Sequence, residues 1–215
     1  MTSGTRERIL EASNELFQRQ GMTGTGIKQI LGLAGAPFSS LYHFFPGGKE
    51  QLAAETIERS GAMYQALVES VFDAAPDIVT GVADCFAAAA ERLRTTDYAD
   101  ACPIATVALE VASTNDTLRE ATARVFDRWV DAGTARFAAA GVENATARDL
   151  AVSVIMLLEG AFVLSRASKS TDALDVAGRT AVAATRAALA SRPKRRASQR
   201  GGSTSSTSKP SRSSR

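Results

Sequence analysis

Residues 34–52 read AGAPFSSLYHFFPGGKEQL, and this stretch decides the fold class. Pro37 can occupy the first turn of a helix without losing a needed N–H group, so it predicts a helix directly after the glycine-containing break at Gly35. On that helix Leu41 and Phe45 share the buried side, and a Pro-Gly-Gly run ends it. A short helix with one buried face and a small, polar outer face can enter the major groove of DNA, which is about 12 Å wide.

The outer face of this predicted helix, Pro37–Phe45, carries groups that suit DNA. They are Pro37, Phe38, Ser39, Ser40, Tyr42 and His43. The serines allow close approach and can donate to bases or phosphates, while the phenol and imidazole supply donors at the rim. The glycines that follow leave backbone N–H groups exposed beside Lys49, a favourable position for a phosphate. Spacing alone also allows a helical hairpin with no role in DNA binding, because short helix pairs are common.

Helical periodicity extends in both directions from this stretch, with no sustained period-2 alternation. Upstream, Thr5–Gln20 reads as an amphipathic helix that ends at Gly21, and a short helix follows Thr25-Gly26. Downstream, helices are expected at about 49–74, 76–95, 102–113, 116–140, 146–170 and 172–191. We therefore expect an all-α protein of nine helices. A three-helix helix-turn-helix domain would span residues 1–48, and a larger helical domain would span 49–191, with 49–74 as its connecting helix.

Charge is unevenly distributed along the 215 residues. The segment Arg192–Arg215 carries 8 of the 25 Lys and Arg and none of the 23 Asp and Glu, so the rest has a formal charge of −6 (17 basic against 23 acidic). A local element, rather than the whole surface, would have to bind any nucleic acid. The basic Ser- and Arg-rich tail at 192–215 has no large apolar residue and is expected to be disordered. It could add salt-sensitive affinity for DNA, and a solubilising role is an equal alternative.

Several classes of protein receive no support from the sequence. Cys85 and Cys102 are too few for a disulfide scaffold and are expected as buried thiols. With a single histidine we expect no metal site, and we expect no cofactor. No catalytic triad or Gly-rich phosphate loop after a strand is evident, so we expect no enzyme. The N-terminus lacks the apolar run of a signal peptide, and the longest apolar stretch, Val152–Leu164, is shorter than the roughly 20 residues of a membrane span, so we expect a cytoplasmic protein with no membrane partner.

Residues 34–52 closely resemble the recognition region of the TetR family of bacterial transcriptional repressors, and Arg8–Phe17 with Gly21 resembles that family's first helix. The run PGGKEQL at 46–52, and later Cys102–Ala105 and Ala108–Glu110, are similar to the LmrA/YxaF-like subgroup. The resemblance implies phosphate contacts from Thr25, Lys28, Tyr42, His43 and Lys49. It also implies that Pro37, Phe38, Ser39 and Ser40 lie nearest the bases.

The chain departs from the family pattern at three positions. Ala36 stands where Val is commoner, Phe38 where Lys or Arg is commoner, and Ser39 where Gly is commoner. Phe38 removes a potential phosphate or guanine contact and could instead touch a thymine methyl group. The operator sequence therefore cannot be taken from relatives. The alternative for Phe38 is packing against the first helix.

In this family the larger domain holds a cavity for a small apolar or amphipathic effector, and such pockets are lined by aromatic residues with a few polar groups. The candidates here are Phe86, Val107, Phe126, Trp129 and Met156, each with core packing as the alternative. Glu110 and Glu159 interrupt apolar runs, and a buried carboxylate must be paired, hydrogen-bonded or protonated. Each either anchors a polar or cationic effector or lies on a face that turns to solvent or to a partner subunit.

Small residues in the last two helices, as at Ala177-Gly178 and Ala183-Ala184, would let two helix pairs form a four-helix bundle across a two-fold axis. The resemblance also implies a homodimer there, bound to an inverted-repeat operator in double-stranded DNA. We therefore expect a repressor that a small-molecule effector releases from a palindromic operator. The alternative is a DNA-binding regulator without an effector, controlled by a protein partner or by its abundance.

Overall fold

The computed structural model describes residues 4–191, and every regular element in this part of the chain is an α-helix. The helices are α1 (Thr5–Gln20), α2 (Ile27–Leu33), α3 (Ser39–Phe44), α4 (Gly48–Ala74), α5 (Ile78–Thr95), α6 (Pro103–Val111), α7 (Asp116–Ala139), α8 (Asn144–Ser168) and α9 (Asp172–Ala190). The prediction of an all-α fold is confirmed. The disorder predicted for residues 192–215 lies outside the described residues.

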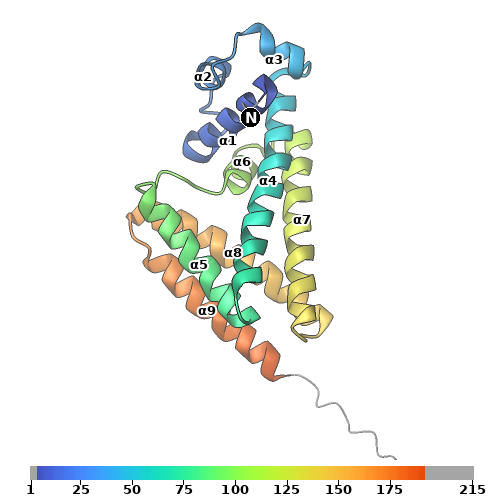
Figure 1. Cartoon of the computed structure of the whole chain (residues 1–215), viewed down its shortest axis with the longest axis vertical. Coiled ribbons are helices and arrows are strands. Elements are labelled where there is room, and N and C mark those ends of the chain that lie inside the picture. The colour runs from blue at the N-terminus through green and yellow to red at the C-terminus, as the bar shows by residue number, and fades with distance from the viewer. Residues whose placement is uncertain (1–3, 192–215) are drawn as a thin grey trace, which may run out of the picture.

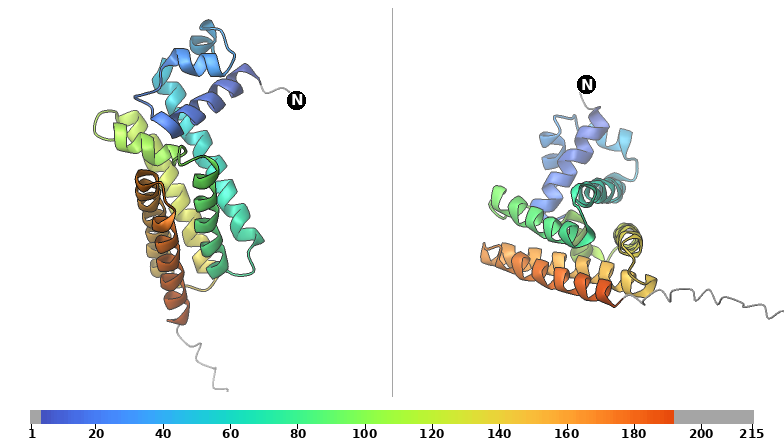
Figure 2. Two further views of the ribbon diagram at one scale, coloured as in Figure 1. Left: turned by 90° about the vertical axis from the view of Figure 1, so that its left-hand side faces the viewer. Right: turned by 60° about the horizontal axis from the view of Figure 1, so that its bottom comes forward.

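The described part of the molecule is elongated, with α1–α3 at one end and the end of α9 at the other (Figure 1). α4 runs from the first group of helices into the second, with α7 beside it. In the second group α5 packs on α9, α9 on α8, and α8 on α7. A view from below shows α5 layered over α8 and α9 (Figure 2). The short α6 lies between the two groups, where it packs on α1, α4 and α7.

Side chains that accept hydrogen bonds from backbone N–H groups begin three of the long helices. The Asp77 carboxylate accepts a hydrogen bond from Thr80 N at 2.9 Å at the start of α5. At the start of α7 the side-chain oxygen of Asn115 accepts from Leu118 N at 2.9 Å. Glu143 accepts from the N–H groups of Ala145 and Thr146 at the start of α8. These contacts satisfy donors that have no partner within the helix, and they lower the pKa of Asp77 and Glu143.

Buried apolar side chains form two clusters. The first joins α1–α4 to α6 and α7, and the second joins α5, α7, α8 and α9. Ile104 and Val107 of α6 lie in the same cluster as Phe17 of α1 and Leu41 of α3. The first three helices therefore share their core with α6, across the domain boundary expected at residue 48. Because this core is close-packed, a displacement of α6 would also displace side chains of α1–α3.

Candidate DNA interface and inner polar site

Helix α3 is anchored by its inner side and by contacts from α1. Leu41 and Phe45 are 1% and 0% exposed, so the buried side predicted for this helix is confirmed. The Arg6 guanidinium lies 5.3 Å from the centre of the Phe45 ring, and Arg8 Nε donates to the Ala34 carbonyl at 2.9 Å in the turn before α3. These contacts fix which face of α3 points away from the protein.

The outward face of α3 begins with an aromatic pair. Phe38 and Tyr42 are 55% and 58% exposed, and their rings meet edge to face with centroids 6.3 Å apart. The alternative in which Phe38 packs in the core is therefore wrong. Pro37 and Phe38 precede the helix instead of starting it, because the Pro37 carbonyl accepts from Ser40 N in a turn. Pro37, Ser39 and His43 are also exposed, and Ser40 is half-buried.

Of the three further phosphate-binding candidates, only Lys28 is a plainly exposed cation on α2. Thr25 is 1% exposed, and its hydroxyl donates to the Gly21 carbonyl. The expectation of a phosphate contact from this hydroxyl is corrected, because the group is buried and already used. Lys49 is half-buried, and its Nζ donates to the Met22 carbonyl at 2.8 Å. Lys49 thus holds the loop between α1 and α2 from the first turn of α4.

Gly47, the N-cap residue of α4, and Gly48, its first residue, use their own N–H groups within the turn. Gly47 N donates to Gln51 Oε1 at 2.8 Å, and Gly48 N donates to the Phe45 carbonyl at 2.8 Å. The N–H groups of Gly47 and Gly48 are therefore already used within the turn. A phosphate at the next backbone N–H groups of α4, beside Lys49, stays a prediction. Gly48 has a positive φ of 67°, a conformation that favours glycine and brings the backbone beside the Tyr42 ring.

The five apolar effector candidates do not come together in one place. Phe126 and Trp129 meet edge to face on α7, with ring centroids 5.6 Å apart. Val107 is buried in the first cluster, and Phe86 lies in the second, against Gly178 of α9. Met156 is 62% exposed on α8, so it does not line an inner cavity. An open groove of about 370 Å³ between α5 and α9 includes Phe86 but neither Phe126 nor Trp129.

An inner polar site is formed by Tyr64 of α4, Cys102 at the start of α6 and Glu159 of α8, and all three side chains are half-buried. Burial raises the pKa of Glu159 to about 7, and a hydrogen bond from the Cys102 thiol opposes that rise. Burial likewise raises the pKa of Cys102 well above its usual value and that of Tyr64 to about 12. At neutral pH the thiol and phenol are neutral, and the Glu159 carboxyl ionises less readily than an ordinary glutamate. Among the described residues, no lysine or arginine forms an ion pair with Glu159.

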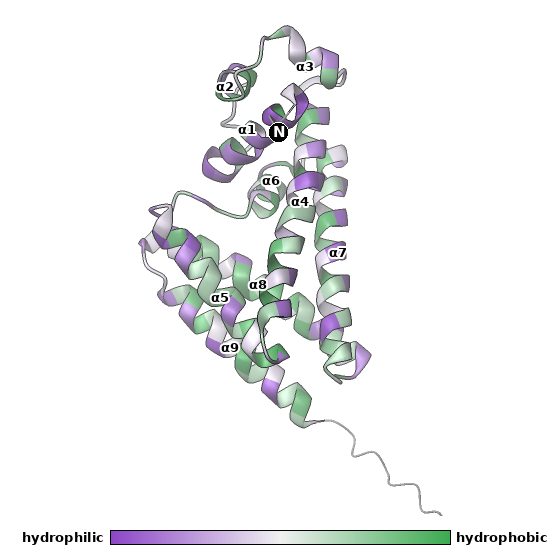
Figure 3. Cartoon of the chain, viewed as in Figure 1, coloured by the Kyte–Doolittle hydropathy of each residue, from purple (hydrophilic) through white to green (hydrophobic). Residues whose placement is uncertain are grey.

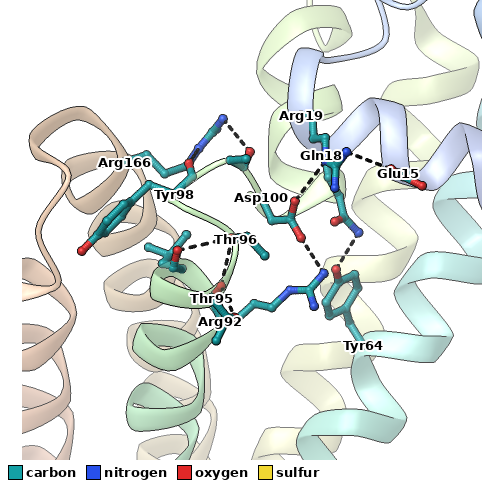
Figure 4. Close-up of polar contacts among 12 residues, drawn as sticks. Glu15, Gln18, Arg19, Tyr64, Arg92, Thr95, Thr96, Tyr98, Asp100 and Arg166 are labelled. Carbon is teal, nitrogen blue, oxygen red and sulfur yellow. Dashed lines mark hydrogen bonds and ion pairs between the residues drawn. The ribbon is translucent and has the colours of Figure 1, made fainter.

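Polar contacts of Tyr64, one member of this site, and of Asp100 join α1 to the larger domain (Figure 4). Gln18 Nε2 donates to the Tyr64 hydroxyl at 2.7 Å. The buried Asp100, in the segment between α5 and α6, pairs with Arg19 of α1 at 3.5 Å and with Arg92 of α5. These contacts could not be predicted from the sequence, because nothing in it distinguishes these polar residues from ordinary residues of the surface.

Glu110 occupies a different place from Glu159. Its Oε2 accepts a hydrogen bond from the backbone N–H of Thr23 at 2.8 Å, in the loop between α1 and α2. Its other oxygen lies where a side chain on Gly21 would begin. The expectation that Glu110 binds an effector is therefore corrected, because this half-buried carboxylate already accepts a hydrogen bond from the Thr23 backbone.

The outer faces of α8 and α9 are apolar and exposed. The exposed large side chains are Met156, Val163, Leu164 and Val176. Within residues 4–191, α8 is the one helix long and apolar enough to cross a membrane, judged by length and composition. In Figure 3 much of α8 has the colour of hydrophobic residues, whereas α1 is largely coloured as hydrophilic. Ala183 and Ala184 are exposed as a dimer face requires, whereas Ala177 and Gly178 are buried and Gly178 packs on Phe86 of α5.

Comparisons with known proteins agree with this geometry. The family model for the tetR family of bacterial regulatory proteins matches residues 9–56, and the model for the C-terminal domain of LmrA/YxaF-like transcriptional regulators matches 78–180. The HTH-type regulator Rv0196 of Mycobacterium tuberculosis is 34% identical over 82% of this chain and 91% of its own length. LmrA of Bacillus subtilis is 31% identical over 79% and 90%.

Solved structures show the same fold. The TetR regulatory protein of Rhodobacter sphaeroides superposes with a TM-score of 0.75 at 21% identity, covering 85% of this chain and 99% of the other. With both domain models matched and full-length relatives above 30% identity, the chain belongs to the TetR family of helix-turn-helix transcriptional regulators, in its LmrA/YxaF-like group.

Proposed function

We propose that this protein is a repressor that binds an inverted-repeat operator as a homodimer and is released by a small molecule. The observation that carries the DNA-binding role is the exposed pair formed by Phe38, directly before α3, and Tyr42 on α3. The other side of this helix is fixed in the core by Leu41 and Phe45. A rigid support with free side chains is what base reading needs, because direct readout depends on fixed geometry. A repressor acts on chromosomal DNA, so we assign it to the cytoplasm.

A second copy of the chain is the proposed cover for α8 and α9. Met156, Val163 and Leu164 lie on one side of α8, while Ala151 and Ala161 of the same helix are buried in the domain. A two-fold axis through the outer faces would give a four-helix bundle, and the two α3 helices would then have to lie about 34–36 Å apart to read successive major grooves. A dimer explains the apolar face better than lipid does, because the inner side of α8 packs on α7 and α9.

The inner polar site is the proposed contact for an effector. A carboxyl with no cation beside it favours an amphipathic ligand that carries an amine or another strong donor. The half-buried pair Phe126 and Trp129 would supply apolar surface for the rest of the ligand. The alternative, a regulator without an effector that is controlled by a protein partner or by abundance, is favoured by the separation of Phe86, Val107 and Met156 into three places.

Selection of bound duplexes from a random pool tests the DNA-binding role, followed by affinity measurement on the enriched sequence. We expect an inverted repeat with one half-site for each α3, and we expect Tyr42→Phe to weaken binding to all sequences alike. Compounds with and without an amine are then screened for release of the protein from that duplex. A dimer that prefers no inverted repeat over random duplex contradicts the proposal, and release by no compound favours the alternative.

A further inference from the structure

The loop between α1 and α2, residues 21–26, is held by side chains from two other helices. Lys49 Nζ, in the first turn of α4, donates to the Met22 carbonyl at 2.8 Å. Glu110 Oε2, near the end of α6, accepts from Thr23 N at 2.8 Å. One contact comes from the helix that carries the DNA-binding end, and the other comes from the larger domain.

The approach of Glu110 to this loop depends on a glycine. Gly21 has a φ of 71°, which favours glycine, and a Cβ at this position would overlap the Glu110 carboxylate. The space above Gly21 is therefore filled by a side chain that lies 89 positions further along the chain. Two independent features of the loop, its backbone conformation and its missing side chain, fit the presence of Glu110.

The opposite end of α6 reaches the inner polar site. Cys102 is the N-cap residue of α6, where its sulfur accepts from Ala105 N at 3.5 Å, and its thiol also contacts Glu159 of α8. Just before it, Asp100 pairs with Arg19 at the end of α1. The nine residues of α6 thus join a half-buried carboxyl of the larger domain to the loop that places α2 and α3.

We propose that Glu110 is a positioning residue through which α6 controls the DNA-binding helices. A helix of this length moves as a unit, so a ligand that displaces Cys102 from Glu159 also shifts Glu110 and releases the Thr23 amide. The freed loop lets α2 and α3 leave the arrangement that fits DNA. This inference rests on the proposed function and names the residue through which the larger domain regulates it.

Hydrogen exchange of the Thr23 amide, measured without DNA, tests the restraint directly. Glu110→Ala removes the acceptor, Glu110→Gln keeps an acceptor oxygen at the same reach, and Glu120→Ala, an exposed glutamate of α7 that pairs with Arg119, is the control. A hydrogen bond to a charged group predicts exchange about 10-fold faster in Glu110→Ala, an intermediate rate in Glu110→Gln, and no change in Glu120→Ala. An unchanged rate in Glu110→Ala overturns the inference.

Affinity for the selected duplex tests the consequence. A coupling of ordinary size predicts that Glu110→Ala weakens binding about 5-fold or more, with partial rescue in Glu110→Gln. Faster exchange with unchanged affinity overturns the regulatory role of Glu110. If the wild-type protein binds no inverted repeat, the proposed function fails separately, and the exchange rate of Thr23 still decides whether Glu110 restrains the loop.

A double-mutant cycle tests transmission through α6 without knowledge of the effector. Glu159→Gln changes the inner polar site, and we expect it to alter Thr23 exchange in the wild-type background. In the Glu110→Ala background the same change should have no further effect, because the link to the loop is already gone. Equal effects of Glu159→Gln in both backgrounds, or no effect in either, overturn the transmission through α6.

Discussion

The indole Nε1 of Trp129 donates a hydrogen bond to the carbonyl oxygen of Gly61 at 3.0 Å, which fastens α7 to α4. Gly61 permits this approach because it has no side chain. A Cβ there would lie 2.5 and 2.7 Å from the two methyl groups of Val125. Since α4 carries the DNA-binding end, its seating on α7 sets the position of that end relative to the larger domain.

Gly61→Ala should therefore destabilise the protein, by about 1–3 kcal/mol as in other overpacked cores. Helix propensity alone would favour alanine by about 1 kcal/mol, so a destabilising result identifies the clash with Val125 as the larger effect. Urea unfolding gives the free energy of each variant. The control is Gly160→Ala on α8, where a Cβ would meet no other atom within 4 Å. Gly61→Ala combined with Val125→Ala should regain part of the loss, and equal behaviour of the two glycine variants would contradict the packing described.

The order of helices and the buried side of α3 could be predicted because their signals are local. Leu41 and Phe45 lie one helical turn apart, and the Pro37 and Gly47-Gly48 breaks are short-range backbone signals. Helix bounds followed from such breaks to within two residues. The chemistry of the outer face was also readable, because a helix with one buried side must expose the other.

The role of Glu110 could not be predicted, because its partner is a backbone N–H group 87 residues away. Every residue except proline has a backbone N–H group, so the sequence cannot show which one is the donor. An acidic residue in an apolar run indicated only that its carboxylate needed a hydrogen-bond or ion-pair partner. Ala177-Gly178 shows the same limit. Small residues predicted a close helix contact correctly, but the neighbour is Phe86 of α5 and not a second subunit.

Glu159→Gln should change how stability depends on pH. A carboxyl whose folded pKa is about 7, against an ordinary value of 4.5, contributes stability that is fully present below pH 4.5 and is lost as the pH rises through 7. The variant cannot ionise and escapes this loss. We expect its unfolding free energy to exceed that of the wild type by roughly 3 kcal/mol more at pH 8 than at pH 4.5. Urea titrations at both pH values measure the difference, and a difference independent of pH would contradict the burial of an uncompensated carboxyl.

Phe38→Lys should change which operators are preferred, with little effect on stability. The ring is 55% exposed, so the change in unfolding free energy should stay within about 0.5 kcal/mol. Lysine favours guanine in the major groove, whereas an aromatic ring can contact a thymine methyl group.

The control is Leu33→Lys, at a 51% exposed position on α2, which adds the same charge to the same end of the protein. Selections should give a new ranking for Phe38→Lys and the wild-type ranking for Leu33→Lys. The same ranking in all three proteins would mean that Phe38 does not read bases.

Leu164→Asp should separate the subunits if α8 and α9 form the dimer. Leu164 is 62% exposed in one chain, and a second chain would bury it, so a carboxylate there would lose its water without gaining a partner. Such a penalty commonly amounts to several kcal/mol, which weakens association by about 100-fold or more.

The control is Leu67→Asp, at a 57% exposed position on α4, which places the same charge away from the proposed interface. Sedimentation velocity should show monomers for Leu164→Asp and dimers for the wild type and Leu67→Asp. A dimer that survives Leu164→Asp but is lost in Leu67→Asp would move the interface to α4.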